Sequence, residues 1–271
     1  MQRCRNHLGF SLVELSIVLV ILGLLIGGVL SGQALIRAAE LRSVTAEYQK
    51  YIAAINSFRD KYFGLPGDIA NGASFGWTDA AGVAVANGDG NGQINYTSVS
   101  TTNEVSSFWV ELAKAGLIEG SYTLFSDAFG TMPPGTSNPR AKMNNGNWNS
   151  LGIGTVDVTG MPSYTAGGSY CSYCFYAGTY GNVLYFNPSD NALAVGGNGI
   201  LKSEEAWNID TKMDDGKPDR GSVTTLKRQG SSTAGYGCGN ISSSTSAMAP
   251  SSYDLANNSQ AACSLVFKTG Y

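Results

Sequence analysis

The stretch 9-GFSLVELSIVLVILGLLIGGVLSGQAL-35 decides the fold, because it is an apolar run long enough to cross a lipid bilayer. About 20 predominantly apolar residues span the hydrocarbon core as a helix. One carboxylate, Glu14, interrupts the run near its start. A charged side chain in an apolar span costs on the order of 3 kcal/mol on insertion scales, so its presence indicates a function. Its place four residues after Phe10 suggests a cationic partner from another chain.

This N-terminal pattern resembles that of the type IV prepilins and the type II secretion pseudopilins. In that family a short basic leader ends in glycine and is followed by an aromatic residue, a glutamate and an apolar run. Here the leader is MQRCRNHLG, and FSLVELSIVLVILGLLIGG follows it. The resemblance implies cleavage between Gly9 and Phe10 by a prepilin peptidase and N-methylation of Phe10. It also implies that Glu14 pairs with the N-terminal ammonium of a neighbouring subunit during filament assembly.

A secretory signal peptide is the main alternative for the same stretch. Such a peptide has a 7–15-residue apolar core followed by a cleavage site of small residues. This run is longer, and the junction between Gly9 and Phe10 precedes it. Arg3 and Arg5 precede the run as well, which places the leader on the cytoplasmic side. We therefore expect a cytoplasmic leader at 1–9 and a transmembrane segment at 10–35. The resemblance implies the bacterial inner membrane, an extracytoplasmic C-terminal head, and later a pilus or periplasmic filament.

The helix is expected to continue beyond the membrane segment, over 10–63. Apolar residues recur at spacings of three and four after Arg37, as on one face of a helix. They are Leu41, Val44, Tyr48, Tyr51, Ile52, Ile55, Phe58 and Tyr62. Charged residues, Glu47 among them, are assigned to the other face. Gly64 and Pro66 then end the helix. A helix from Phe10 to Tyr62 would be about 80 Å long.

The remaining residues, 64–271, are expected to form one extracytoplasmic globular head. Thr101-x-x-Glu104 is a capping-box pattern, which predicts a short second helix that stops at Gly116. Beyond residue 120 the pattern is mostly that of strands and turns, with the best strands at 183–186 and 265–267. A long N-terminal helix packed on an antiparallel sheet is an α+β fold, and it matches the pilin fold.

Cysteine usage fits an exported chain. Cys4 would leave with the leader, and an even number of cysteines in an exported domain suggests disulfides. The remaining four are Cys171, Cys174, Cys238 and Cys263. They allow three pairings, of which Cys171–Cys174 and Cys238–Cys263 are favoured because many pilins carry a disulfide-closed C-terminal loop. A redox role for Cys171 and Cys174 is less well supported, because their flanks do not indicate a helix N-terminus. A four-cysteine zinc site would need two close pairs, whereas Cys238 and Cys263 are far apart in the sequence.

The composition argues against catalysis and against nucleic-acid binding. The only histidine, His7, belongs to the leader, which removes the histidine-dependent catalytic triads. Gly72-Ala-Ser74-Phe-Gly76 matches the nucleophile-elbow pattern, but it lies in a glycine-rich stretch with no apolar strand before it. The formal net charge is −3 and no long basic run occurs, so no nucleic-acid partner is expected.

Two segments could bind Ca²⁺ as a cofactor. The first, NGDGNGQI at 87–94, resembles the start of an EF-hand loop. Its side chains Asn87, Asp89 and Asn91 and the carbonyl of Gln93 could converge on one ion. Position twelve is Ser98 in place of the usual glutamate, and the same composition is common in ordinary turns.

The second segment is 207-WNIDTKMDDGKPD-219. Its candidate ligands are the carboxylates of Asp210, Asp214, Asp215 and Asp219. The first two would share a helix face and repel each other unless a cation neutralises them. The alternative is that Lys212 and Lys217 are simple ion-pair partners of these carboxylates.

The sequence therefore predicts a non-catalytic structural subunit of a type IV pilus or type II secretion filament. The presence of Glu14 and the size of the head favour a minor pilin or a pseudopilin, but the system is left open. Expected partners are other pilin or pseudopilin subunits, the prepilin peptidase, the inner-membrane assembly platform and the membrane. The alternative is a surface adhesin or binding module that is exported as a pilin.

Overall fold

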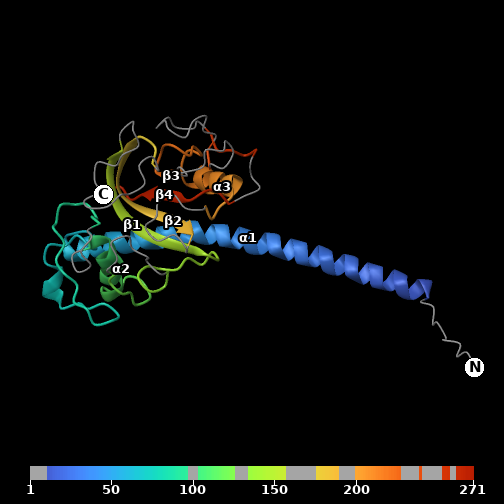
Figure 1. Ribbon diagram of the computed structural model, residues 1–271, viewed down its shortest axis with the longest axis horizontal. Helices are drawn as coiled ribbons and strands as arrows, with labels where there is room; N and C mark the ends of the chain where they lie inside the picture. The colour runs from blue at the N-terminus through green and yellow to red at the C-terminus, as the bar shows by residue number, and fades with distance from the viewer. Residues whose placement is uncertain are drawn as a thin grey trace, which may run out of the picture. The chain divides into compact units, whose positions relative to one another are not determined.

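The computed structural model describes residues 11–96, 103–125, 134–156, 175–188, 199–226, 238–239, 252–256 and 261–271. Eight elements follow one another along the chain (Figure 1). They are α1 (Leu12–Tyr62), the one-turn 3-10 helix η1 (Gly72–Phe75), α2 (Glu104–Lys114), β1 (Gly146–Val156), β2 (Gly178–Pro188), α3 (Ser203–Met213), β3 (Val223–Thr225) and β4 (Leu265–Lys268). The chain divides into two compact units, Met1–Arg42 and Ser43–Tyr271.

The first unit consists of the apolar turns of α1. Its most apolar 18 residues have a mean hydropathy of 2.6, and none of them is buried. The large apolar side chains between Leu12 and Ile36 are 46–85% exposed. This helix is long and apolar enough to cross a membrane, by length and composition, and it ends at Tyr62 as predicted.

The second unit, which we call the head, is built on a four-stranded antiparallel sheet with the order β1-β2-β4-β3. The predicted strands at 183–186 and 265–267 lie in β2 and β4, paired so that Tyr185 faces Val266. The α+β prediction is confirmed. β1 was not predicted, because its sequence GNWNSLGIGTV lacks the alternation of apolar and polar residues that marks a half-buried strand.

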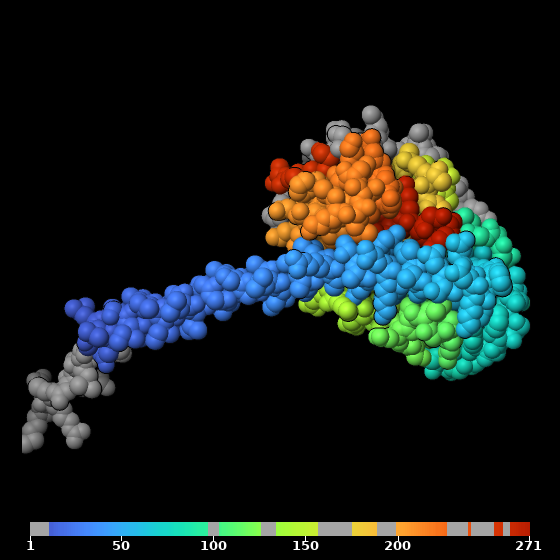
Figure 2. Space-filling model, turned by 180° about the vertical axis from the view of Figure 1, so that it is seen from behind, coloured from blue at the N-terminus to red at the C-terminus, as the bar shows by residue number. Residues whose placement is uncertain are grey.

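The last five turns of α1 belong to the head and bury the predicted apolar face. Val44, Ile55 and Phe58 are at most 1% exposed. The ring of Tyr51 contacts two tryptophan rings edge-on, Trp109 of α2 at 5.1 Å and Trp148 of β1 at 5.6 Å. Figure 2 shows these light-blue turns between the red and orange C-terminal residues on one side and the green residues of α2 on the other.

Three details differ from the sequence prediction. Glu47, assigned to the polar face of α1, is only 7% exposed. α2 begins at Glu104 with Asn103 as its N-cap, and not at a capping box from Thr101, which lies outside the described residues. Residues Ser203–Met213 form α3, whereas the sequence predicts mostly strands and turns in this region. The helix is not evident from the sequence because its apolar spacing is short and interrupted by charged residues.

Candidate functional site

The amino end of α1 positions Glu14 in the first helical turn. Its Oε2 accepts a hydrogen bond from the backbone N–H of Ser11 at 3.0 Å, and the Ser11 Oγ accepts one from the N–H of Val13 at 3.3 Å. Serine at the N-cap and glutamate three residues later form a capping box, which the sequence analysis missed although Ser11-Leu-Val-Glu14 is its pattern. Gly9 and Phe10, the predicted processing site, lie outside the described residues.

The predicted calcium ligands of the loop 87–94 make hydrogen bonds within the protein. The Asn87 Oδ1 accepts a hydrogen bond from the N–H of Ala73 at 2.9 Å. The Asn91 Nδ2 donates to Asp89 Oδ2 at 2.7 Å, and the Asn91 Oδ1 accepts from the N–H of Gln93 at 2.7 Å. The bond to Asn87 joins the loop to η1, and the other two are those of a local turn.

Asp89 instead meets two carboxylates from other segments, Asp68 and Glu104. One carboxylate oxygen from each of the three residues lies within 4.8 Å of the others. Asp68 and Glu104 are 3% and 4% exposed, whereas Asp89 is exposed. Sequence reasoning missed both partners, because Asp68 stands in the stretch LPGD and Glu104 was read as part of a helix cap.

Backbone N–H groups hold this carboxylate cluster in place. Asp68 accepts hydrogen bonds from the N–H groups of Asn91 at 3.1 Å and Gly92 at 2.8 Å. Glu104 accepts from the N–H groups of Asp89 at 3.0 Å and Asn95 at 2.6 Å. Each bond fastens the loop 88–95 to a buried acid. The loop is therefore folded around negative charge.

Burial dominates the electrostatics of the cluster. The pKa of Asp68 is raised to about 6, chiefly by burial and in part by the neighbouring Asp89, while the backbone N–H groups oppose the shift. Burial likewise raises the pKa of Glu104 to about 7, with smaller contributions from the charges of Asp89 and Asp68. Removing a carboxylate from water disfavours its charged form, so both groups bind protons more tightly than ordinary carboxylates do, and a bound cation would oppose this shift.

Of the four carboxylates predicted as ligands in the segment 207–219, three lie close together. Asp210, Asp214 and Asp215 each have a carboxylate oxygen within 4.8 Å of the others. Asp219 is not in this group, and it pairs with Arg220 at 2.9 Å. The proposed ion-pair alternative is not seen either, since within the described part of the chain neither lysine of this segment pairs with these carboxylates.

Asp210 has a partner of its own. It accepts a hydrogen bond from the Tyr253 hydroxyl at 2.7 Å. The pKa of Asp210 is raised to about 7, chiefly by burial; the hydrogen bonds from Tyr253 and Gly216 oppose the shift, and the charges of Asp215 and Asp214 add to it. The carboxylate therefore has a structural use, because it anchors a residue of the C-terminal region to α3.

Comparison with known protein families bears on the amino end. Residues 4–30 match the prokaryotic N-terminal methylation motif. The chain carries the type IV pilin and pseudopilin signature. The matched range contains both the predicted cleavage site and Glu14. No curated protein and no solved structure matches the chain.

This pilin-like chain has a disulfide between Cys238 and Cys263, 25 residues apart, which is one of the two favoured pairings. The carbonyl of Cys263 accepts hydrogen bonds from the N–H groups of Ile200 at 2.9 Å and Leu201 at 3.1 Å, so the bridge is tied to the segment that leads into α3. The other favoured pair, Cys171 and Cys174, lies outside the described residues.

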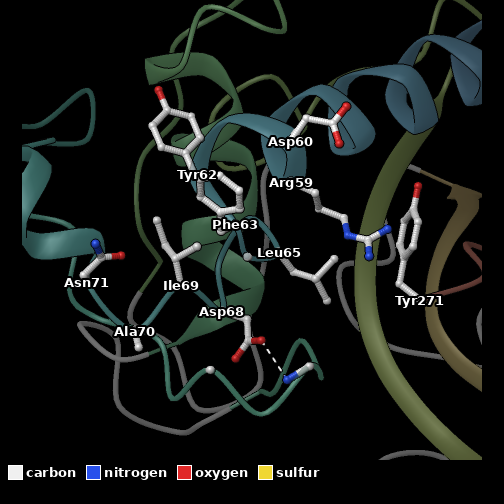
Figure 3. Close-up of a pocket in the computed structure, with 13 residues that line it drawn as sticks. Arg59, Asp60, Tyr62, Phe63, Leu65, Asp68, Ile69, Ala70, Asn71 and Tyr271 are labelled. Atoms are coloured by element: carbon white, nitrogen blue, oxygen red, sulfur yellow. Dashed lines mark hydrogen bonds between the residues drawn. The ribbon is translucent and has the colours of Figure 1, made fainter.

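A cavity of about 790 Å³ lies where α1 ends (Figure 3). Arg59 and Tyr271 form one wall, with the guanidinium carbon 4.3 Å from the ring centroid. Phe63 lies at the rim; it is 94% exposed and has a φ of 58°, which is unusual for an aromatic residue. Asp68 reaches the cavity from the carboxylate cluster. The sequence analysis did not predict this feature.

Proposed function

We propose that this chain is a non-catalytic structural subunit of a type IV pilus or a type II secretion filament, and specifically a minor pilin or a pseudopilin. The observation that supports this most directly is a lone carboxylate, Glu14, at the start of an exposed apolar helix and inside the methylation motif. An apolar helix that is left exposed by the described residues of its chain needs either lipid or other helices around it.

In the proposed assembly, prepilin peptidase removes the leader after Gly9, and the new N-terminal residue Phe10 is methylated. The helix is held in the inner membrane with the head outside, and it then moves from lipid into the core of a filament. Glu14 there pairs with the Phe10 ammonium of a neighbouring subunit. A buried ion pair is far less costly than a single buried charge, so the contact selects the position at which a subunit joins.

In the free subunit the Glu14 carboxylate already accepts a hydrogen bond. Glu14 accepts the N–H of Ser11, so assembly exchanges this intrachain hydrogen bond for an ion pair between subunits. The exchange keeps the carboxylate compensated on both sides of the reaction. It also favours a helix that is fully formed before it leaves the membrane, because the capping box stabilises its first turn.

The test is incorporation of Glu14→Val into filaments sheared from cells that express the assembly system. The variant should be processed normally, because the cleavage site is intact, but should be strongly depleted from the filament fraction. Leu15→Val is the matched control, since it changes a neighbouring apolar residue and keeps the carboxylate. Gly9→Ala should yield an unprocessed, larger band. Normal incorporation of Glu14→Val would contradict the proposed role.

A second candidate function is a binding module that is exported as a pilin. The cavity near Phe63 favours it, since its volume is in the range of small-molecule pockets and it combines aromatic with charged walls. Fractionation of sheared filaments separates the two candidates. A subunit distributed along the shaft supports a structural role, whereas one confined to the tip or absent from filaments supports a binding role.

A further inference from the structure

We propose that Asp68, Asp89 and Glu104 form a Ca²⁺ site of the head. The three residues come from the turn after α1, the loop 88–95 and the first turn of α2, and they converge to within 4.8 Å of one another. Ca²⁺ takes six to eight oxygen ligands and accepts irregular geometry, which suits carboxylates from three separate segments. The site would join these segments around one ion.

No positive side chain accounts for this convergence. The described residues contain ion pairs between Arg37 and Glu40 and between Arg220 and Asp219, and neither involves the cluster. Among the described residues, hydrogen bonds to the buried carboxylates come from backbone N–H groups, which carry partial charges. Two of the three acids are almost fully buried, so the repulsion between them is weakly screened.

A fourth acid, Glu111, gives an independent indication of a cation. It is fully buried, and it lies two turns after Glu104 on the same face of α2. Helical side chains lean toward the N-terminus, so Glu111 extends toward the turn of α2 that carries Glu104, although its carboxylate is not one of the three that converge within 4.8 Å. Its Oε2 accepts a hydrogen bond from the N–H of Gly67, the neighbour of Asp68, at 2.6 Å. Its Oε1 has no hydrogen-bond partner among the described residues.

Two further buried oxygens lack a hydrogen-bond partner among the described residues, and they belong to the segments that carry Asp89 and Glu104. Asn103, the residue before Glu104, is 1% exposed, and its Oδ1 neither caps α2 nor finds a donor in the described part of the chain. The Gln93 Oε1 is likewise buried without a partner there. Buried acceptors without donors are rare in folded proteins. A hard cation supplies what these oxygens lack, because it binds oxygen ligands of either charge.

The site is accessible from solvent. Asp68, Gly90 and Gly92 line the cavity at the end of α1, and Asp89 is exposed (Figure 3). Both glycines have positive φ, 71° and 83°, which lets the loop bend around Asp68. An ion can therefore reach the site from the side of this loop, and the helices need not unfold.

The test uses the full-length chain in detergent, with thermal unfolding followed by tryptophan fluorescence in EDTA, in Ca²⁺ and in Mg²⁺. We expect Ca²⁺ to raise the Tm, and Asp89→Asn to raise the half-saturating Ca²⁺ concentration by about tenfold or more. Asp214→Asn, in the other acidic group, is the matched control and should keep the full response. Titration calorimetry on the unmutated chain gives the affinity directly, so the proposal does not depend on a variant that folds.

Competition with protons provides a second readout. Metal ligands must be deprotonated, so Ca²⁺ should bind about tenfold or more weakly at pH 5 than at pH 8. Glu104→Gln should lose the Ca²⁺ response, because it removes one of the three converging carboxylates. An unchanged Ca²⁺ response in Asp89→Asn, loss of the response only in Asp214→Asn, or no Ca²⁺ binding at pH 8 would each overturn the proposal.

Discussion

The Glu47 carboxylate of α1 accepts a hydrogen bond from the indole Nε1 of Trp148 in β1, at 2.8 Å, inside the head. Its other oxygen accepts from the backbone N–H of Lys142, also at 2.8 Å. The side chain thus connects the long helix to the first strand of the sheet and to the turn before it. Because Trp148 also contacts Phe186 and Phe267, the contact fixes where α1 sits along the core.

Glu47→Ala should lower the free energy of unfolding of the head by about 2–4 kcal/mol, because it leaves the buried indole N–H of Trp148 without an acceptor and removes the part-buried hydrogen bond from the N–H of Lys142. Urea unfolding in detergent, followed by tryptophan fluorescence, measures the change. Lys50→Ala, an exposed residue of the same helix, is the control and should change stability by less than about 0.5 kcal/mol. Equal effects of the two substitutions would show that the Glu47 contact is not stabilising.

The sequence predicted the elements with strong, uninterrupted patterns. The apolar run and the spacing of Val44, Tyr51 and Phe58 define α1, and the β-branched and aromatic runs define β2 and β4. It did not predict the role of Glu47, because helical periodicity assigns a carboxylate to the solvent side. Only the tertiary structure shows two N–H donors that compensate its burial.

The candidate site could be predicted only in part, for a related reason. The amino-end motif is local, so its residues can be read directly from the chain. The carboxylate cluster is not local, since Asp68, Asp89 and Glu104 are separated by 15 or more residues. The glycine-rich loop indicated Asp89, but its partners depend on how α2 packs against the turn that follows α1.

The stability of the head should fall as the pH rises, in the absence of divalent cations. Burial raises the pKa of Glu111 to about 8, with a further contribution from the charges of Glu104 and Asp68. The folded head therefore binds this proton more tightly than the unfolded chain does. The resulting stability is fully present below the ordinary glutamate pKa and is lost as the pH rises toward 8.

Each such proton makes the free energy of unfolding fall by up to about 1.4 kcal/mol per pH unit. Asp68 contributes to this fall up to a pH of about 6, and Glu104 up to a pH of about 7. Urea midpoints measured in EDTA from pH 5 to pH 8 give the slope. Glu111→Gln should flatten it and stabilise the head at pH 8, whereas Glu119→Gln, at an exposed position, should leave it unchanged. A slope that is unaffected by Glu111→Gln would rule out this assignment.

Gly67→Ala should be among the most destabilising single substitutions in the head. Gly67 has a φ of 86°, and a Cβ there would clash with the carbonyl oxygen of Glu104 and lie 3.2 Å from the backbone nitrogen of Phe108. Left-handed strain and overpacking together should cost about 2–5 kcal/mol. The turn after α1 would be pushed away from α2, and the bond from the Gly67 N–H to Glu111 would be lost.

Gly76→Ala is the matched control, because Gly76 has a φ of 64° but nothing within 4 Å of an added Cβ. It should cost only the backbone strain, about 1–2 kcal/mol. The difference in urea midpoint between the two variants isolates the close approach of the turn to α2. If the two variants are equally stable, the turn is not packed as closely as described.

Removal of the Cys238–Cys263 disulfide should lower the free energy of unfolding by about 2–4 kcal/mol. The bridge joins residues 25 apart in the sequence and so lowers the conformational entropy of the unfolded chain. The double substitution to alanine is preferred to serine, since both cysteines are buried and a hydroxyl there would lack a partner. Dithiothreitol should destabilise the unmutated chain at least as much as the double substitution does. Any effect of the reductant that persists in the double variant comes from the remaining cysteines. A double variant that is as stable as the unmutated chain would show that this bridge does not stabilise the head.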